Sequence, residues 1–174
     1  MKLSRRHVVA GTVGVLVLGT IMPGAQASPA SATLKVVTFV TAQLDHSLHL
    51  KHDGVALRTK SPTDIRMQTL TFLAGDRTGW HHHPGLVLVA VQTGSVTVWS
   101  AYCTTTTYGP GLAAGAVFTE NSNDPQEVTS AAGGTVFATF VVPRAVPPVF
   151  RIEDASVSCP LPVTGHRSEV EDSP

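Results

Sequence analysis

The stretch Gly79-Trp80-His81-His82-His83-Pro84-Gly85 contains three consecutive histidines, whose imidazoles are potential metal ligands. In an extended strand successive side chains point to opposite faces, so His81 and His83 share one face and His82 lies on the other. Two imidazoles on one rigid face can offer nitrogen atoms to a single metal ion. Such a pair is also typical of a solvated, histidine-rich turn, and the surrounding sequence has to decide between the two interpretations.

Around this stretch, the chain from Thr33 to Val149 consists of short strand-like segments separated by turn residues. The run from Leu86 to Val91 is continuously apolar and bounded by glycines, which is typical of a strand buried on both faces. The segment from Ile65 to Leu73 alternates, as a strand with one buried face does. Further strands are predicted at residues 34–40, 95–99, 116–119, 127–130 and 135–142. We therefore expect one all-β domain, a sandwich or a barrel.

The spacing around the histidines resembles a known family. Gly75, His81, His83, Val87 and Gly94 stand at the intervals of the first cupin motif, in which Val87 is usually a glutamate. The series Gly115, Asn121, Asn123, Gln126 and Ser130 keeps the intervals of the second motif, in which Gln126 is usually a histidine. The resemblance covers roughly residues 60 to 142 and is nearest to small exported bacterial cupin-2 proteins. It implies a jelly-roll barrel, the double-stranded β-helix, with degenerate metal-binding motifs.

The resemblance also implies which residues could hold a divalent metal ion. His81 and His83 are retained, whereas Val87 cannot ligate and Gln126 offers one neutral carbonyl oxygen. We therefore expect a weak site of His81, His83 and Gln126, with metal identity open. Residues outside the motif positions could complete this set. They are Glu127 if a bulge shifts its register, Glu120 or Asp124 from the inter-strand loop, and His46, His49 or His52, which otherwise fit exposed positions.

Three kinds of function remain open at this point, and one of them is a structural or surface protein that uses the barrel as a scaffold without using its histidines. A metal-dependent cupin would use the ion in the pocket, and if it is an enzyme the resemblance implies an oxygenase or isomerase type. The alternative is a metal-free module that binds a small molecule or sugar without catalysis. In either case Val87, Val89, Val91 and Trp80 are the expected pocket residues. The resemblance further implies a homodimer.

The first 27 residues differ from the rest and predict a signal peptide. Arg5-Arg6 precedes an apolar stretch to about Ile21, and Ala25-Gln26-Ala27 fits a signal-peptidase site. The paired arginines resemble a twin-arginine export signal. We therefore expect an exported protein, secreted or held at the cell envelope, without a stable membrane span after cleavage. In an oxidising compartment Cys103 and Cys159 are expected to form a disulfide.

The composition excludes one class of binding partner. Lys plus Arg and Asp plus Glu each number 12, so no basic field attracts phosphates and nucleic acid is not an expected partner. The charges at Asp76-Arg77 are expected in a solvated turn. The predicted organisation is a leader (1–27), N-terminal strands and lead-in (28–59), the cupin barrel (60–150), and a C-terminal strap with a mobile tail (151–174).

Overall fold

A computed structural model describes residues 27–120 and 123–159. The predicted leader, apart from Ala27, and the predicted mobile tail beyond Leu161 lie outside these residues. Within them, no helix is long and apolar enough to cross a membrane. The strands are β1 (Lys35–Leu44), β2 (His49–His52), β3 (Val55–Arg58), β4 (Thr63–Phe72), β5 (His81–His82), β6 (Leu86–Gly94), β7 (Val96–Ser100), β8 (Thr105–Tyr108), β9 (Val117–Glu120), β10 (Gln126–Thr129), β11 (Gly134–Pro143) and β12 (Ile152–Glu153).

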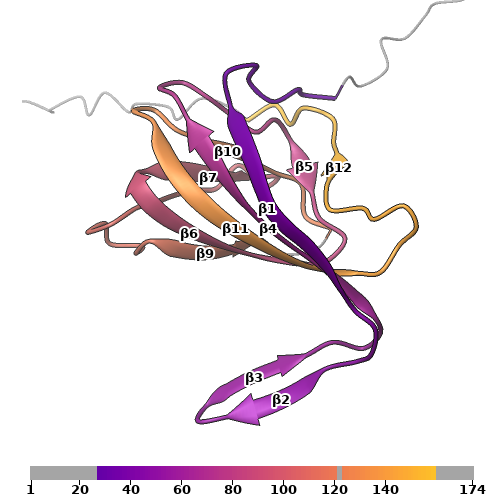
Figure 1. Cartoon of the computed structure of the whole chain (residues 1–174). Coiled ribbons are helices and arrows are strands. Elements are labelled where there is room, and N and C mark those ends of the chain that lie inside the picture. The colour runs from indigo at the N-terminus through magenta and orange to yellow at the C-terminus, as the bar shows by residue number, and fades with distance from the viewer. Residues whose placement is uncertain (1–26, 121–122, 160–174) are drawn as a thin grey trace, which may run out of the picture.

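Two five-stranded antiparallel sheets face each other and form the barrel (Figure 1). The first sheet has the order β1-β4-β11-β6-β9, and the second has the order β12-β5-β10-β7-β8. Consecutive strands therefore often lie in opposite sheets, as in a jelly roll. This strand order confirms the prediction of an all-β jelly-roll barrel.

The core lies between the two sheets and follows from alternation along the strands. In β6 every second residue is buried, and β9 and β11 follow the same rule. The buried apolar side chains come from both sheets and from the segment after β11, residues 144–159, which is called the strap from here on. They are Phe72, Val87, Val89, Val91, Val96, Phe118, Val128, Val136, Ala138, Phe140, Val142 and Phe150.

All seven predicted strands are present, but one expectation about β6 is wrong for the single chain. The continuous apolar run predicted a strand buried on both faces. Val87, Val89 and Val91 are indeed buried, whereas Leu86 and Leu88 on the other face are 41% and 47% exposed. No helix covers that face within the described residues, and it therefore meets solvent.

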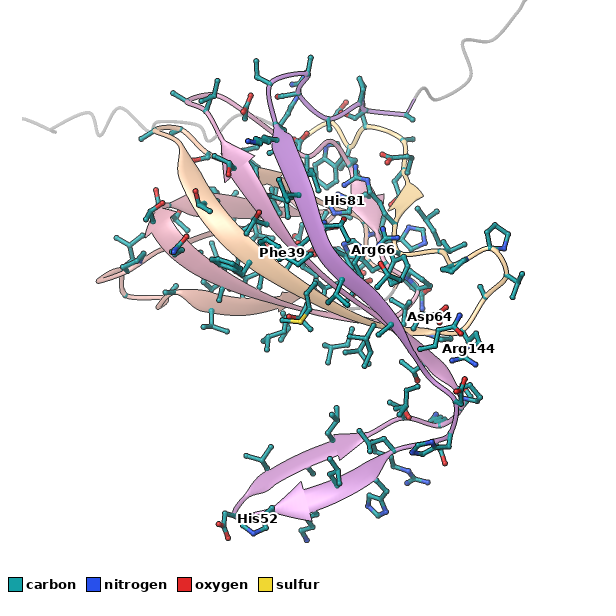
Figure 2. The ribbon with its side chains drawn as sticks, in the orientation of Figure 1. Phe39, His52, Asp64, Arg66, His81 and Arg144 are labelled. Atoms are coloured by element: carbon teal, nitrogen blue, oxygen red, sulfur yellow. A yellow bond between two sulfur atoms is a disulfide. The ribbon has the colours of Figure 1, made fainter. Side chains whose placement is uncertain are left out.

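The hairpin β2–β3 was not predicted from the sequence, although Asp53-Gly54 is a strong signal for a two-residue turn. Both turn residues have positive φ, 45° and 83°, as such a turn requires. The hairpin extends from the barrel as an arm, with His52 near its tip (Figures 1 and 2). At its base Arg144 Nη1 lies 2.7 Å from Asp45 Oδ1, and Arg144 Nε lies 3.4 Å from the buried Asp64 Oδ1.

The turn at Asp76-Arg77 is solvated at residues 73–75 and at Arg77, as expected, but the Asp76 side chain is buried, contrary to the expectation from its charge. Asp76 is only 3% exposed. Its carboxylate accepts hydrogen bonds from the Thr33 hydroxyl and from the Leu73 amide, the latter at 2.7 Å. The Thr33 hydroxyl is the main cause that lowers the pKa of Asp76. The carboxylate therefore stays ionised and joins the N-terminal segment to the turn after β4.

The segment after β11 closes one side of the barrel. It carries Phe150 into the core, pairs β12 with β5, and ends at a disulfide between Cys103 and Cys159. This confirms the predicted cysteine pairing. The bridge links the β7–β8 turn to the strap across 56 residues of sequence.

Removing this bridge is expected to destabilise the barrel by about 4 kcal/mol, because the unfolded chain regains the entropy of a long closed loop. The test compares urea unfolding of the parent chain with a Cys103→Ser/Cys159→Ser double variant. Dithiothreitol should lower the parent's midpoint toward that of the variant and leave the variant unchanged. Equal midpoints for the two oxidised proteins would contradict this expectation.

Candidate metal centre

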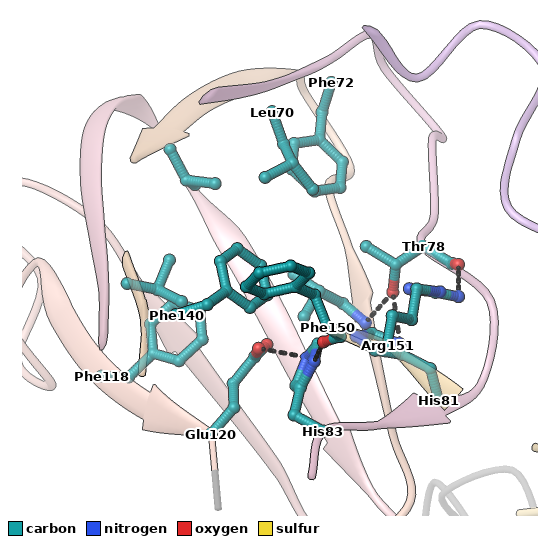
Figure 3. Close-up of a pocket in the computed structure, with 13 residues that line it drawn as sticks. Leu70, Phe72, Thr78, His81, His83, Phe118, Glu120, Phe140, Phe150 and Arg151 are labelled. Atoms are coloured by element: carbon teal, nitrogen blue, oxygen red, sulfur yellow. Dashed lines mark hydrogen bonds and ion pairs between the residues drawn. The ribbon is translucent and has the colours of Figure 1, made fainter. Parts of the chain in front are cut away.

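A small cavity of about 70 Å³ lies inside the barrel between the two sheets (Figure 3). Its polar end holds His81, His83 and Glu120, and its remaining walls are mainly apolar. The lining residues are Leu70, Phe72, Thr78, His81, His83, Val89, Phe118, Glu120, Val128, Val136, Phe140, Phe150 and Arg151.

His81 is held by the backbone just before it. Its ring is 3% exposed, and its Nδ1 lies 2.9 Å from the carbonyl oxygen of Gly79. Gly79 has φ +70°, and a Cβ there would lie 1.9 Å from the carbonyl oxygen of Ser28. Only glycine fits this position. Because a carbonyl can only accept, Nδ1 carries the proton and Nε2 keeps a free lone pair.

His83 is held in the same way by the strap. Its ring is 2% exposed, and its Nδ1 lies 2.6 Å from the carbonyl oxygen of Phe150. The bond assigns the proton to Nδ1 and leaves the Nε2 lone pair for another partner. The two imidazole rings lie 4.8 Å apart, edge to face. His81 and His83 therefore converge on the same cavity.

Glu120 supplies the carboxylate that the first motif lacks. It is the last residue of β9 and the direct cross-strand partner of Val87 on β6. Directly opposed residues of an antiparallel pair project to the same face, so Glu120 points into the barrel beside Val87. The sequence predicted it in the inter-strand loop, and its place within β9 corrects that expectation. One carboxylate oxygen lies 3.0 Å from Nε2 of His83.

The contact between His83 and Glu120 requires a cation or a proton to be favourable. Nε2 of His83 is buried and has no hydrogen-bond partner among the described residues, although the carboxylate is close. A lone pair and a carboxylate oxygen this close repel each other unless a cation or a proton lies between them. One ligand atom each from His81, His83 and Glu120 lies within 4.8 Å of the others. Two imidazoles and one carboxylate are a common ligand set for a divalent transition metal ion, so the residues fit one.

The surroundings also keep His81 neutral. Burial lowers the pKa of His81 to about 4, and the positive charge of Arg151 acts in the same direction. Arg151 itself pairs with Glu153 and donates to the carbonyl oxygen of Thr78. A neutral imidazole is the form that ligates metal, so His81 is in its binding form at neutral pH.

The structure places the other expected ligands as follows. Gln126 is the direct cross-strand partner of His81 and projects to the same face, and its buried Nε2 has no hydrogen-bond partner among the described residues. Gln126 is not among the residues that line the cavity, and its part in the site stays a prediction. Glu127 is opposite Trp99 on the alternate face, where burial raises its pKa. Asp124 is exposed, and His46, His49 and His52 are exposed in or beside the arm. His82 points away from the cavity, with Nδ1 2.8 Å from the Asp154 carboxylate.

The expected pocket residues are all buried, but they do not all reach the cavity. Val89 lines it, whereas Val87, Val91 and Trp80 belong to the surrounding barrel interior. The alternation rule placed the valines on the inner face correctly. Which of them touches the cavity depends on the packing of Phe118, Phe140 and Phe150 around it.

Comparisons with known proteins gave structural similarities at low sequence identity. No family model matches the chain, and no curated protein sequence matches it. The structure is similar to a cupin superfamily protein from Desulfitobacterium hafniense, with 10% identity, a TM-score of 0.41, and coverage of 59% of this chain and 79% of that one. It is also similar to a conserved protein of unknown function from Streptococcus pyogenes, with 15% identity, a TM-score of 0.41, and coverage of 60% and 77%.

A third similar structure is a mutant form of the salicylate 1,2-dioxygenase from Pseudoaminobacter salicylatoxidans, with 17% identity and a TM-score of 0.43. The match covers 66% of this chain but only 27% of the dioxygenase chain. The jelly-roll arrangement of the present barrel rests on its own strand order.

Replacing Glu120 with glutamine is expected to stabilise the metal-free protein by about 1 kcal/mol, because the amide N–H can donate to the free Nε2 of His83. The measurement is urea unfolding of Glu120→Gln and of the parent, both treated with a chelator. Val117→Thr, an exposed change on the same strand, is the control. A metal-free Glu120→Gln protein less stable than the parent would show that His83 and Glu120 already form a satisfied ion pair.

Proposed function

We propose that the protein binds one divalent transition metal ion inside the barrel through Nε2 of His81, Nε2 of His83 and the carboxylate of Glu120. One observation carries this proposal. Each histidine donates a hydrogen bond from Nδ1–H to a backbone carbonyl, and the two free nitrogens share a buried cavity with a carboxylate. Metal-ligating histidines are usually oriented in this way by a second hydrogen bond. With Glu120 as third ligand, the site no longer depends on Gln126.

The cavity limits what could bind next to the ion. About 70 Å³ corresponds to roughly two water molecules, so a small ligand fits without rearrangement and a drug-sized one does not. A bound ion would supply Lewis acidity and open coordination positions. The chain's own contribution is a dry, apolar wall and neutral imidazoles held in one orientation. An oxygenase- or isomerase-type reaction on a small substrate is the enzymatic form of this proposal.

The test is elemental analysis of the purified protein, with the metal then exchanged on and off by chelation. We expect about one ion per chain in the parent, and at least roughly a tenfold loss of affinity in His81→Ala/His83→Ala, since both free nitrogens disappear. His82→Ala is the matched control, because its ring faces away from the cavity. Metal content that is equal in all three proteins would exclude this site.

A metal-free binding module is the second candidate, and the apolar lining of the cavity favours it. Small aromatics or sugars would then raise the melting temperature of a protein whose stability is unaffected by chelators. In that case Glu120 and His83 would share a proton, as an imidazolium–carboxylate pair, in place of a metal ion. The same elemental analysis distinguishes this candidate from the first.

We also propose that the protein is exported by the twin-arginine route, which carries folded proteins and would preserve an ion acquired before export. The leader-like residues 1–27 and the Cys103–Cys159 disulfide support this. Arg5→Lys/Arg6→Lys is expected to leave the precursor inside the cell, whereas Lys2→Arg should be exported normally. Cell fractionation with N-terminal sequencing measures both. A parent protein that keeps Met1 and stays in the cytoplasm would refute the proposal.

A further inference from the structure

A groove of about 440 Å³ lies outside the barrel, at the base of the arm. Its volume falls within the roughly 300–1,000 Å³ of pockets that bind small organic molecules. Residues 57–61, at the end of the arm, form one wall, and residues 84–86 and 141–143 of the first sheet and its approach form another. The groove shares no described lining residue with the barrel cavity. It is therefore separate from the proposed metal centre.

Arg58 and Lys60 bring positive charge to the arm wall of the groove. Both residues are exposed, and neither forms an ion pair among the described residues. The described lining contains no acidic residue. The acids nearest to this wall in the sequence, Asp53 and Asp64, each already lie against a basic side chain. The charge of the wall is therefore uncompensated and attracts an anion.

Between the two cations, Thr59 supplies a hydrogen-bond donor in a fixed position. Its amide donates to the carbonyl oxygen of Leu48 at 2.9 Å, and its Oγ1 accepts a hydrogen bond from the Leu48 amide at 2.8 Å. A hydroxyl can donate while it accepts. The Thr59 hydroxyl proton has no acceptor among the described residues, so it is free to donate to a ligand in the groove.

The wall that carries these groups is anchored to the barrel. The Arg144 amide donates to the carbonyl oxygen of Pro62 at 3.1 Å. The Arg144 side chain pairs with Asp45 and Asp64 at the base from which the arm extends (Figure 2). These contacts hold the end of the arm against the first sheet. The groove is therefore preformed, as most small-molecule pockets are.

The rest of the groove is largely apolar. Leu57 and Leu86 line it and are 38% and 41% exposed. Leu86 pairs with Val141 at the end of β11, which also lines the groove. Gly85 makes this approach possible, because a Cβ there would lie 2.5 Å from the Val141 carbonyl oxygen. A ligand in the groove therefore meets apolar surface beside the positive wall.

We propose that this groove binds a single-chain amphipathic carboxylate, such as a medium-chain fatty acid. The carboxylate lies between Arg58 and Lys60 and accepts a hydrogen bond from Thr59, while the hydrocarbon chain lies on Leu57 and Leu86. A guanidinium offers a planar pair of donors that matches the two oxygens of a carboxylate. The groove has the arm on one side and the sheet on the other, which suits one free molecule better than a flat bilayer. The inference is independent of the proposed metal site.

The test is isothermal titration calorimetry of the purified protein with octanoate, below the concentration at which octanoate forms micelles and with a chelator present. We expect one octanoate per chain, bound at least about tenfold more tightly than 1-octanol, because only the carboxylate gains charge-assisted hydrogen bonds. Acetate should give no measurable binding at the same concentrations, because it lacks the chain that buries apolar surface.

Arg58→Gln/Lys60→Gln is expected to lose at least about tenfold in affinity for octanoate and to bind 1-octanol as the parent does. Lys51→Gln is the matched control, because Lys51 carries the same charge on the same arm but does not line the groove. Leu86→Asn should weaken octanoate and 1-octanol alike, because both lose apolar contact. Circular dichroism checks that each variant is folded.

Absence of octanoate binding by the parent would overturn the proposal, and so would unchanged affinity in Arg58→Gln/Lys60→Gln. Equal affinities for octanoate and 1-octanol would show that the charge is not recognised and would overturn it as well. A parent that sediments with vesicles of anionic phospholipid but does not bind octanoate would assign the basic wall to a membrane surface instead. Because the chelator is present throughout, none of these outcomes depends on the metal proposal.

Discussion

The candidate site depends on two hydrogen bonds from imidazole to backbone. The carbonyl oxygens of Gly79 and Phe150 accept hydrogen bonds from Nδ1–H of His81 and His83. These bonds orient both rings so that the Nε2 lone pairs point toward the cavity. One carbonyl lies in the turn before β5, and the other lies in the strap after β11. The strap, the turn and the barrel must all be in place before the ligands converge, so the site and the fold form together.

The apolar interior of the barrel makes these polar groups costly to bury. Glu120, His81 and His83 are each no more than 5% exposed, and Phe118, Phe140 and Phe150 surround them. A carboxylate in such surroundings is destabilising unless a cation, a proton or a donor compensates it. The chain retains the Glu120 carboxylate beside Nε2 of His83, which has no hydrogen-bond partner among the described residues. The free energy gained by burying the apolar core can offset the cost of burying this carboxylate. This retained carboxylate supports the proposed binding site, because a purely structural core would favour an apolar residue at position 120.

The two faces of the first sheet follow the same alternation and are both apolar. The inner residues form the core and the wall of the cavity, whereas the outer residues remain uncovered in a single chain. The arm repeats this arrangement on a smaller scale, with an apolar side that packs on nothing substantial in its own barrel.

Local spacing was enough to determine that His81 and His83 share an inner face, that seven strands form one all-β domain, and that the two cysteines pair. These features follow from a period of two along a strand and from the scarcity of cysteines. Only the tertiary structure brought a carboxylate to the two histidines, because strand register joins residues far apart in sequence. It pairs Glu120 with Val87 and places Glu120 in one cluster with His81 and His83. A strand extended by one residue past Thr119 would have placed Glu120 on the inner face with Phe118, but its partner could not be known without the register.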